Sequence, residues 1–192
     1  STISENERLI NNVVYSITQD NKKELLLGTM KGLCVYNGIT FKNYNEKQGL
    51  KNSYIFKLQK DDNRTWIGTM AGVYIFEDGK IKSFNKDTIL NNSSIYSIFI
   101  DYNKNIWFGT IQNGVIFFDK KTNEIKRFDT SNGLLNNLIF SISQVGNGDI
   151  LIGTQTGLNT IDAQFKVKEL TAIPTNTNLA ISSLLQNSES EF

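Results

Sequence analysis

The sequence contains no histidine among its 192 residues. This absence excludes Ser-His-Asp and Cys-His catalysis, histidine general bases, HExxH zinc sites and a histidine pH switch within the chain. The one cysteine, Cys34, excludes an internal disulfide and any multi-cysteine metal site. The composition therefore argues against an enzyme, and we expect no cofactor and no metal.

The sequence also has few arginines, no long apolar run and a single proline, and each of these limits its possible partners or its fold. The chain has only three arginines, and its 20 basic residues are balanced by 19 acidic ones, which argues against nucleic-acid binding. No apolar run approaches the length that crosses a bilayer, so we expect no membrane span in this chain. The single proline, Pro174, falls in a connector, and no segment shows helical periodicity.

A repeated Gly-Thr pair dominates what the sequence does contain. The pairs begin at Gly28, Gly68, Gly109 and Gly153, and successive pairs lie 40, 41 and 44 residues apart. Each pair follows two apolar residues and precedes a second glycine with an aliphatic neighbour; the third copy has one extra residue within 111–113. Features that recur together at a fixed period identify an internal repeat.

A second block recurs upstream of each Gly-Thr pair, after an Asn-rich turn. Its copies are Val14–Ile17, Ile55–Leu58, Ile95–Ile98 and Ile139–Ile142, and a fifth, Ile181–Leu184, is followed by no Gly-Thr pair. The predicted repeats are 10–48, 49–88, 89–132 and 133–176, with a partial fifth at 177–187. We expect them to form one partial domain over residues 1–192.

Each repeat reads as four short strands that are rich in β-branched and aromatic residues and separated by turn residues. In the second repeat the predicted strands are 54–59, 65–69, 72–76 and 80–84. Asp78-Gly79 and, in the first repeat, Asn37-Gly38 accept the positive φ angles of type I′ hairpin turns.

Antiparallel four-strand units of this length are typical of β-propeller blades, whereas the rival, a parallel β-helix, has shorter repeats. The sequence therefore predicts an all-β fold of four complete β-propeller blades plus the first strand of a fifth, as part of a larger propeller.

The repeat resembles the two-component regulator propeller family. That family's pattern is a Gly-Leu and Asn-rich lead, a first strand, a polar turn, Leu-Trp-Ile-Gly-Thr and then x-x-Gly-Leu. The segments 49–73 and 133–159 match it almost in full, although Leu26 and Leu151 replace the tryptophan in two repeats. The resemblance covers residues 10–185.

The resemblance implies an extracytoplasmic, ligand-sensing propeller segment of a membrane-anchored, two-component-type bacterial signalling protein, periplasmic or at the cell surface. It further implies recognition of a carbohydrate and relay of a conformational signal to an output domain. Two alternatives stay open: a protein–protein interaction scaffold without a small ligand and, least favoured because histidine is absent, a propeller lyase.

Several conspicuous residues have structural interpretations that we favour. No helix is predicted after the Gly-Thr pairs, so they do not form a phosphate loop. The segment 101–105 begins like a calcium loop but lacks its glycine and its glutamate, so a hairpin turn is expected. Trp66 and Trp107 occupy positions where other repeats have leucine, and Cys34 falls on a third strand; we expect all three in the core.

The short loops after the Gly-Thr pairs differ between repeats, as binding loops on a repeated scaffold do. They supply the candidate ligand-binding residues Met30, Lys31, Met70, Ile111, Gln112, Asn113, Gln155 and Thr156. The expected partners are an oligosaccharide and the remaining blades or output domain of the parent sensor. Because terminal blades expose apolar faces, we also expect self-association.

Overall fold

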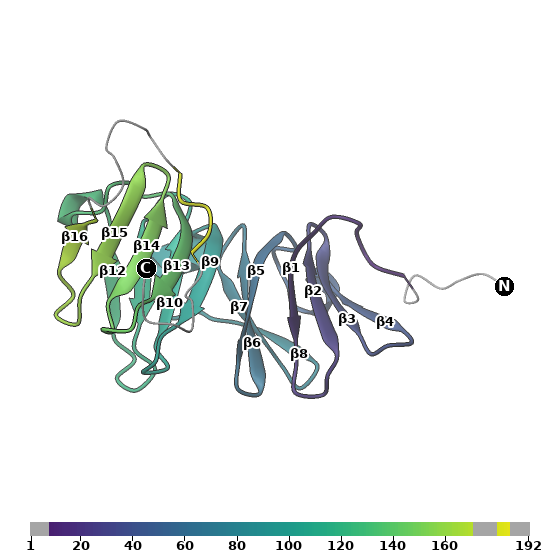
Figure 1. Cartoon of the computed structure of the whole chain (residues 1–192). Helices are drawn as coiled ribbons and strands as arrows, with labels where there is room; N and C mark the ends of the chain where they lie inside the picture. Colours follow the sequence, from purple (N-terminus) through teal and green to yellow (C-terminus); the bar gives the residue numbers. More distant parts are fainter. Residues whose placement is uncertain (1–7, 171–179, 185–192) are drawn as a thin grey trace. The chain divides into compact units, whose positions relative to one another are not determined.

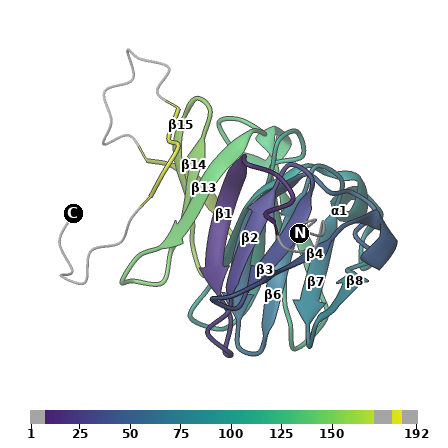
Figure 2. The same ribbon diagram turned by 90° about the vertical axis from the view of Figure 1, so that its right-hand side faces the viewer.

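The computed structural model describes residues 8–170 and 180–184, and within these residues it contains sixteen strands in four antiparallel four-stranded sheets (Figure 1). Within every sheet the strands lie side by side in chain order, as Figure 2 shows for β1 to β4. The predicted all-β fold of propeller blades is confirmed. The strands are β1 (Val14–Gln19), β2 (Leu25–Thr29), β3 (Gly32–Tyr36), β4 (Phe41–Tyr44), β5 (Ile55–Asp61), β6 (Arg64–Thr69), β7 (Val73–Glu77), β8 (Lys80–Ser83), β9 (Ile95–Ile100), β10 (Ile106–Thr110), β11 (Val115–Phe118), β12 (Ile125–Phe128), β13 (Ile139–Gln144), β14 (Ile150–Thr154), β15 (Gly157–Ile161) and β16 (Val167–Glu169).

The chain divides into two compact units, Ser1–Ile95 and Tyr96–Phe192. The first unit contains the sheets β1–β4 and β5–β8, and the second contains β13–β16 and nearly all of β9–β12. Each unit has its own apolar core, because the strands carry apolar residues on both faces and each sheet packs on its neighbour. That the chain forms a single domain stays a prediction.

Short helical turns connect successive sheets at three places. A 3-10 turn, η2 (Glu46–Gln48), follows β4, and a second, η3 (Thr130–Asn132), follows β12. Both carry a capping box and end at a glycine with positive φ, Gly49 or Gly133. The helix α1 (Thr88–Asn92) follows β8 and is capped by the Asp87 side chain. At five residues this helix is too short to produce a helical periodicity in the sequence.

The two hairpins expected to be alike differ. Asp78 and Gly79 both have positive φ, 49° and 73°, as a type I′ turn requires. In the first sheet only Gly38 of the pair does, at 96°, because the connection is four residues long and the Asn37 side chain accepts hydrogen bonds from the backbone N–H groups of Ile39 and Thr40. The prediction of a type I′ turn at Asn37-Gly38 was wrong.

Residues 180–184 show how the fifth copy begins. The backbone N–H of Ile181 donates to the carbonyl of Thr154 at 3.0 Å, and the Ser141 hydroxyl donates to the carbonyl of Ile181 at 2.9 Å. The segment therefore lies against the fourth sheet, although it belongs to none of the sixteen strands. The rest of the predicted copy, up to 179 and from 185, lies outside the described residues.

Candidate functional site

The candidate loop residues lie where the second strand of each sheet turns into the third. Met30, Lys31 and Met70 belong to the first unit, and the remaining five belong to the second. Ile111 and Thr156 are half-buried and the other six are exposed. The loops are therefore accessible within their units, and whether they bind a ligand stays a prediction.

The Gly-Thr pair closes each of these loops. The Thr29 hydroxyl donates to the carbonyl of Gly32 at 2.8 Å and accepts from the N–H of Lys31 at 3.1 Å. The same two hydrogen bonds recur at Thr69, Thr110 and Thr154, and the third loop accommodates its extra residue between them. The structural interpretation of the pair is confirmed, because its threonine satisfies turn groups.

The glycine of the pair allows two sheets to approach closely. A Cβ atom on Gly28 would lie 2.6 Å from Cγ2 of Ile55, and one on Gly109 would lie 2.7 Å from Cγ2 of Ile139. A Cβ on Gly153 would meet Ile181 in the same way, at 2.9 Å. Ile181 thus occupies the position of the first isoleucine of a further repeat.

An aromatic residue stands at the same place on each first strand. Tyr15, Phe56, Tyr96 and Phe140 are all second in the block that precedes the Gly-Thr pair. The strand register shifts across Tyr15, Phe56 and Phe140, so these three are bulge residues. A bulge redirects a side chain away from the regular face of its sheet. This recurrence is visible in the sequence alone.

In the first unit these aromatics gather beside a candidate loop. The hydroxyl groups of Tyr15 and Tyr54 are 2.6 Å apart, and the rings of Tyr54 and Phe56 lie 4.8 Å apart between centroids. The N–H of Met70 donates to the carbonyl of Tyr54, which joins the loop to the cluster. Tyr15 is 47% exposed and Met70 is 51% exposed. We call Tyr15, Tyr54, Phe56, Met30 and Met70 the aromatic end of the first unit.

The two tryptophans are core residues, as predicted, and each is anchored by a buried carboxylate. Nε1 of Trp66 donates to Asp61 at 2.9 Å, and Nε1 of Trp107 donates to Asp101 at 3.0 Å. Asp61 also pairs with Arg64 at 3.2 Å. Asp101 begins the segment that resembles a calcium loop, and its carboxylate also accepts from the N–H of Asn105 within a hairpin turn. Across residues 8–170 and 180–184, no three His, Cys, Asp or Glu side chains gather as a metal site.

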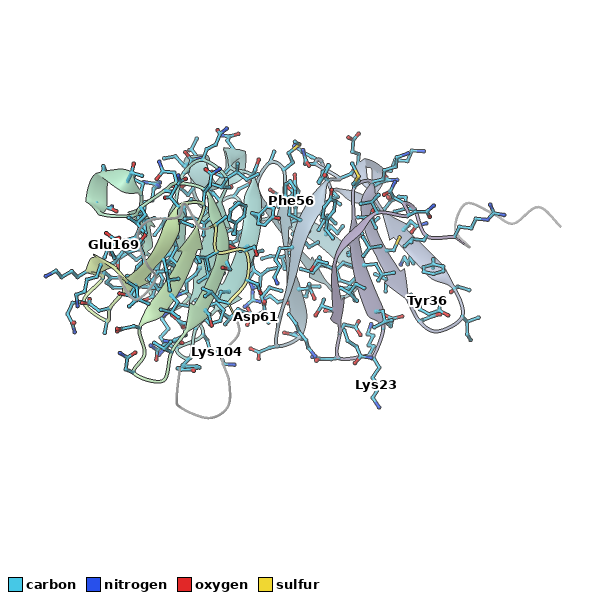
Figure 3. The ribbon with its side chains drawn as sticks, turned by 45° about the horizontal axis from the view of Figure 1, so that its top comes forward. Lys23, Tyr36, Phe56, Asp61, Lys104 and Glu169 are labelled. Carbon is cyan, nitrogen blue, oxygen red and sulfur yellow. The ribbon has the colours of Figure 1, made fainter. Side chains whose placement is uncertain are left out.

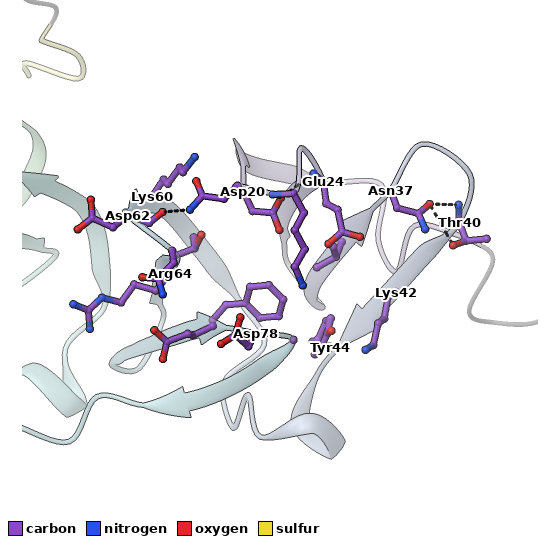
Figure 4. Close-up of a pocket in the computed structure, with 18 residues that line it drawn as sticks. Asp20, Glu24, Asn37, Thr40, Lys42, Tyr44, Lys60, Asp62, Arg64 and Asp78 are labelled. Carbon is purple, nitrogen blue, oxygen red and sulfur yellow. Dashed lines mark hydrogen bonds between the residues drawn. The ribbon is translucent and has the colours of Figure 1, made fainter.

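A cleft of about 430 Å³ lies between the two sheets of the first unit, at the strand ends opposite to the aromatic end (Figure 4). Figure 3 shows these two ends on β5, with Phe56 at one end and Asp61 at the other. The β1–β2, β3–β4, β5–β6 and β7–β8 turns surround the cleft. The side-chain amide of Asn21 donates to the carbonyl of Asp62 at 2.9 Å and ties two of these turns together. No sequence signal had pointed to this region.

The cleft combines an apolar floor with charged walls. Val35, Tyr44 and Phe76 lie in the floor and are each at most 7% exposed. In Figure 4, Lys42 and Tyr44 of the first sheet lie across the cleft from Asp78 of the second, whereas the Arg64 side chain points away from them. The charged groups around the cleft are Asp20, Lys22, Glu24, Lys42, Lys60, Asp62, Arg64, Glu77 and Asp78. The lining is therefore mainly polar and charged around a small apolar floor, which suits a ligand rich in polar groups better than an apolar one.

Outside these two regions, the shifted carboxyl groups serve turns of the second unit. Hydrogen bonds from the hydroxyl and N–H of Ser131 lower the pKa of Asp129, the N-cap of η3. The backbone N–H of Thr122 chiefly lowers the pKa of Asp119, and that of Lys166 the pKa of Asp162. Each carboxylate stabilises its own turn, so none of the three is a candidate for proton transfer.

Cys34 packs in the core of the first unit, as predicted. It is completely buried, and burial raises the pKa of its thiol. Its sulfur accepts from the N–H of Ile10 and donates to the Asn43 side chain. A raised pKa leaves the thiol protonated at neutral pH, so Cys34 has no nucleophilic character.

Residues 89–112 match the family model described as two component regulator propeller. No curated protein matches the sequence. Among solved structures, an extracellular domain assigned to a hybrid two component system of B. thetaiotaomicron superposes with a TM-score of 0.79 at 24% identity. The match covers 96% of this chain and 25% of that one. A second such domain from B. thetaiotaomicron gives a TM-score of 0.73 at 20% identity, over 84% of this chain and 25% of the other.

Propeller enzymes share the fold at lower identity. Catalytically inactive virginiamycin B lyase from Staphylococcus aureus, with one histidine replaced by alanine, superposes with a TM-score of 0.68 at 16% identity, over 90% of this chain and 60% of the lyase. These similarities establish the β-propeller fold. The chain spans about a quarter of the length of the extracellular domains. Over its described residues, no helix is long and apolar enough to cross a membrane.

Proposed function

Because the chain carries a two component regulator propeller repeat, we propose that it is a ligand-sensing segment of a two-component-type signalling protein. In this proposal it lies outside the cytoplasm, binds a carbohydrate and passes a conformational signal onward. The extracellular domains that share its fold support the class of protein and the location. The remaining blades and the output domain belong to the parent protein.

The aromatic end of the first unit is the observation that carries the carbohydrate proposal. Pyranose rings have apolar faces that stack on exposed aromatic side chains, while their hydroxyl groups need polar neighbours. Tyr15, a residue that is 47% exposed, offers both an aromatic ring and a hydroxyl group that is hydrogen-bonded to that of Tyr54. The exposed Met30 and Met70 lie on the flanking loops. In the second unit the proposed contacts are the loop residues Ile111, Gln112, Asn113, Gln155 and Thr156.

A binding role is favoured over catalysis. The S. aureus lyase that shares the fold is inactive when a histidine is replaced, and this chain contains no histidine. The shifted carboxylates of the second unit are committed to turns. We therefore propose that the segment is not an enzyme and acts without a cofactor.

A glycan array probed with the purified chain tests the proposal. We expect binding to one family of oligosaccharides and its loss in Tyr15→Ala and Phe56→Ala, because each change removes a stacking surface. Tyr102→Ala is the matched control, since Tyr102 is also exposed, at 59%, but lies in the β9–β10 turn. Unchanged binding in both aromatic variants would contradict the proposed site, and the absence of any bound glycan would contradict the carbohydrate.

A single exposed residue favours the second candidate function, assembly with another propeller blade. Ile17 of β1 is 62% exposed, whereas its equivalents Leu58, Ile98 and Ile142 are at most 8% exposed. Leu58 is covered because it packs on Gly28 of the preceding sheet. We therefore propose that the chain self-associates by covering this face of β1.

A further inference from the structure

The cleft of the first unit has a counterpart in the second unit that is filled. The sheets β9–β12 and β13–β16 face one another there as β1–β4 and β5–β8 do in the first unit. The space is occupied by Phe165, from the turn between β15 and β16. Its ring lies 5.1 Å from that of Phe117 and 6.1 Å from that of Phe128, and Nζ of Lys126 lies 4.2 Å from its centroid.

The first unit lacks the groups that fill this space. The turn equivalent to that of Phe165 is the two-residue turn Asp78-Gly79, which carries no large side chain. Val35 stands where the second unit has Phe117. The cation is nevertheless retained, because Lys42 occupies the position of Lys126 and lies 5.2 Å from the centroid of the Tyr44 ring. The cleft therefore has room for a ring in the place that Phe165 takes.

Two residues of this cleft carry hydroxyl groups at positions where the other sheets have apolar residues. Tyr44 occupies the position that Phe84, Phe128 and Leu170 hold in the other sheets. Thr65 occupies the position of Leu25, Ile106 and Ile150. The two departures from the apolar pattern thus meet in one cleft, one from each sheet that borders it.

Neither hydroxyl group has a hydrogen-bond partner within the described residues, although Tyr44 is 4% and Thr65 only 2% exposed. The Ser97 hydroxyl is the one unpartnered side-chain group there that is sealed from solvent, so the Tyr44 and Thr65 hydroxyls reach a surface, and the cleft is lined by both residues. Both hydroxyl groups therefore open into the cleft, where each can donate a hydrogen bond to a ligand and accept one from it.

We infer that this cleft binds a cyclic polyol the size of one pyranose ring. The ring takes the place that Phe165 fills in the second unit, with one face toward the apolar floor. Its hydroxyl groups bond to Tyr44 and Thr65, and the surrounding lysine and aspartate side chains bond to its outer edge. This site is separate from the aromatic end, because it lies at the opposite strand ends of the same sheets.

Amide NMR spectra of the purified chain, titrated with myo-inositol, methyl β-glucopyranoside and methyl β-galactopyranoside, test the inference. We expect at least one probe to shift the amide signals of Tyr44, Thr65 and Gly79, whereas cyclohexanol, which has a single hydroxyl group, does not. Thr65→Val and Tyr44→Phe should each weaken binding by about tenfold, the effect of one lost hydrogen bond. Tyr36→Phe is the control, since the Tyr36 hydroxyl donates to the carbonyl of Gly38 outside the cleft.

Thermal unfolding of the unliganded variants supplies a second readout. Thr65→Val should leave the Tm unchanged or raise it, because the Thr65 hydroxyl makes no hydrogen bond to the described residues and the change therefore removes none. A lowered Tm, undiminished binding in both cleft variants, or no shift with any probe would each overturn the inference. Amide shifts confined to Tyr15, Tyr54 and Met70 would overturn the inference about the cleft and support the aromatic end as the binding site. Amide shifts confined to the cleft would support the inference and count against the aromatic end.

Discussion

The buried pair of Asp101 and Trp107 in the third sheet can be compared with the residues at the equivalent positions of the fourth sheet, and the comparison gives a prediction. In the fourth sheet, Val145 and Leu151 hold the two equivalent positions. The turns that follow are alike, since Lys104 donates to the carbonyl of Asp101 and Gly148 to that of Val145, each at 2.9 Å. The double variant Asp101→Val/Trp107→Leu therefore transfers the pair of the fourth sheet into the third.

The expected free energies follow from the contacts. Asp101→Val leaves the indole N–H of Trp107 buried without an acceptor, which lowers the free energy of unfolding by about 1–3 kcal/mol. Trp107→Leu removes ring contacts with Phe117, Phe128 and Phe165 and lowers it by about 2–5 kcal/mol. Leucine has no N–H to satisfy, so the double variant should lose about 1–3 kcal/mol less than the sum of the single variants.

Native-state hydrogen exchange of the β10 and β11 amides measures these free energies within the second unit. The exposed Asn103, in the same turn, supplies the control Asn103→Val, which should change little. Losses that add to within about 0.5 kcal/mol would refute the reasoning, because they would show that Asp101 and Trp107 stabilise the fold independently.

Three further predictions use the same sheets. Gly28→Ala should lower the Tm measured by calorimetry, because the new Cβ atom would lie 2.6 Å from the Ile55 side chain. Gly146→Ala is the control and should not lower it, because a Cβ atom there would have no atom within 4 Å. Equal Tm values for the two variants would count against close packing of the sheets at Gly28. The pKa of Asp129 is lowered in the folded state, so the contribution of its carboxylate to stability is complete above the usual value of 3.8 and disappears as the pH falls through the folded pKa. Asp129→Asn, which copies Asn45 of η2, should flatten the acid dependence of amide exchange in η3. An unchanged acid dependence would show that the Asp129 carboxylate does not stabilise η3. Light scattering should show a mass that rises with concentration and falls in Ile17→Lys; a monomer at every concentration would refute self-association.

The fold was predictable because its signals are local and repeated. Each Gly-Thr pair requires a small residue and a hydroxyl for reasons visible in the structure, and four copies at one period leave few alternatives. The hairpin at Asp78-Gly79 was recognisable from two residues that tolerate positive φ. Asn37-Gly38 misled because the length of a connection depends on where the flanking strands end, which a dipeptide does not encode.

The candidate sites were harder to find, because they depend on differences between repeats rather than on what the repeats share. Tyr44 and Thr65 lie 21 residues apart in different repeats, and neither is unusual for a β-strand. Their importance appears only when the packing of two sheets shows that both hydroxyls enter one cleft without partners. The aromatic end was accessible to sequence reasoning, since an aromatic recurs at each first strand, but the bulges that turn three of them required the strand registers.

The two hydrogen bonds that the threonine of each Gly-Thr pair makes across its loop have a consequence for how such a protein diversifies. Because the hydroxyl binds the two ends of the loop, the closure of the loop does not depend on which side chains stand at its tip. The third loop carries an insertion and keeps both hydrogen bonds. Residues at the tips of these loops can therefore be exchanged or added one loop at a time, while the hydrogen bonds that close each loop are kept. A single scaffold of this kind is suited to grafting, in which loops taken from one blade are transplanted to another to alter what the surface recognises.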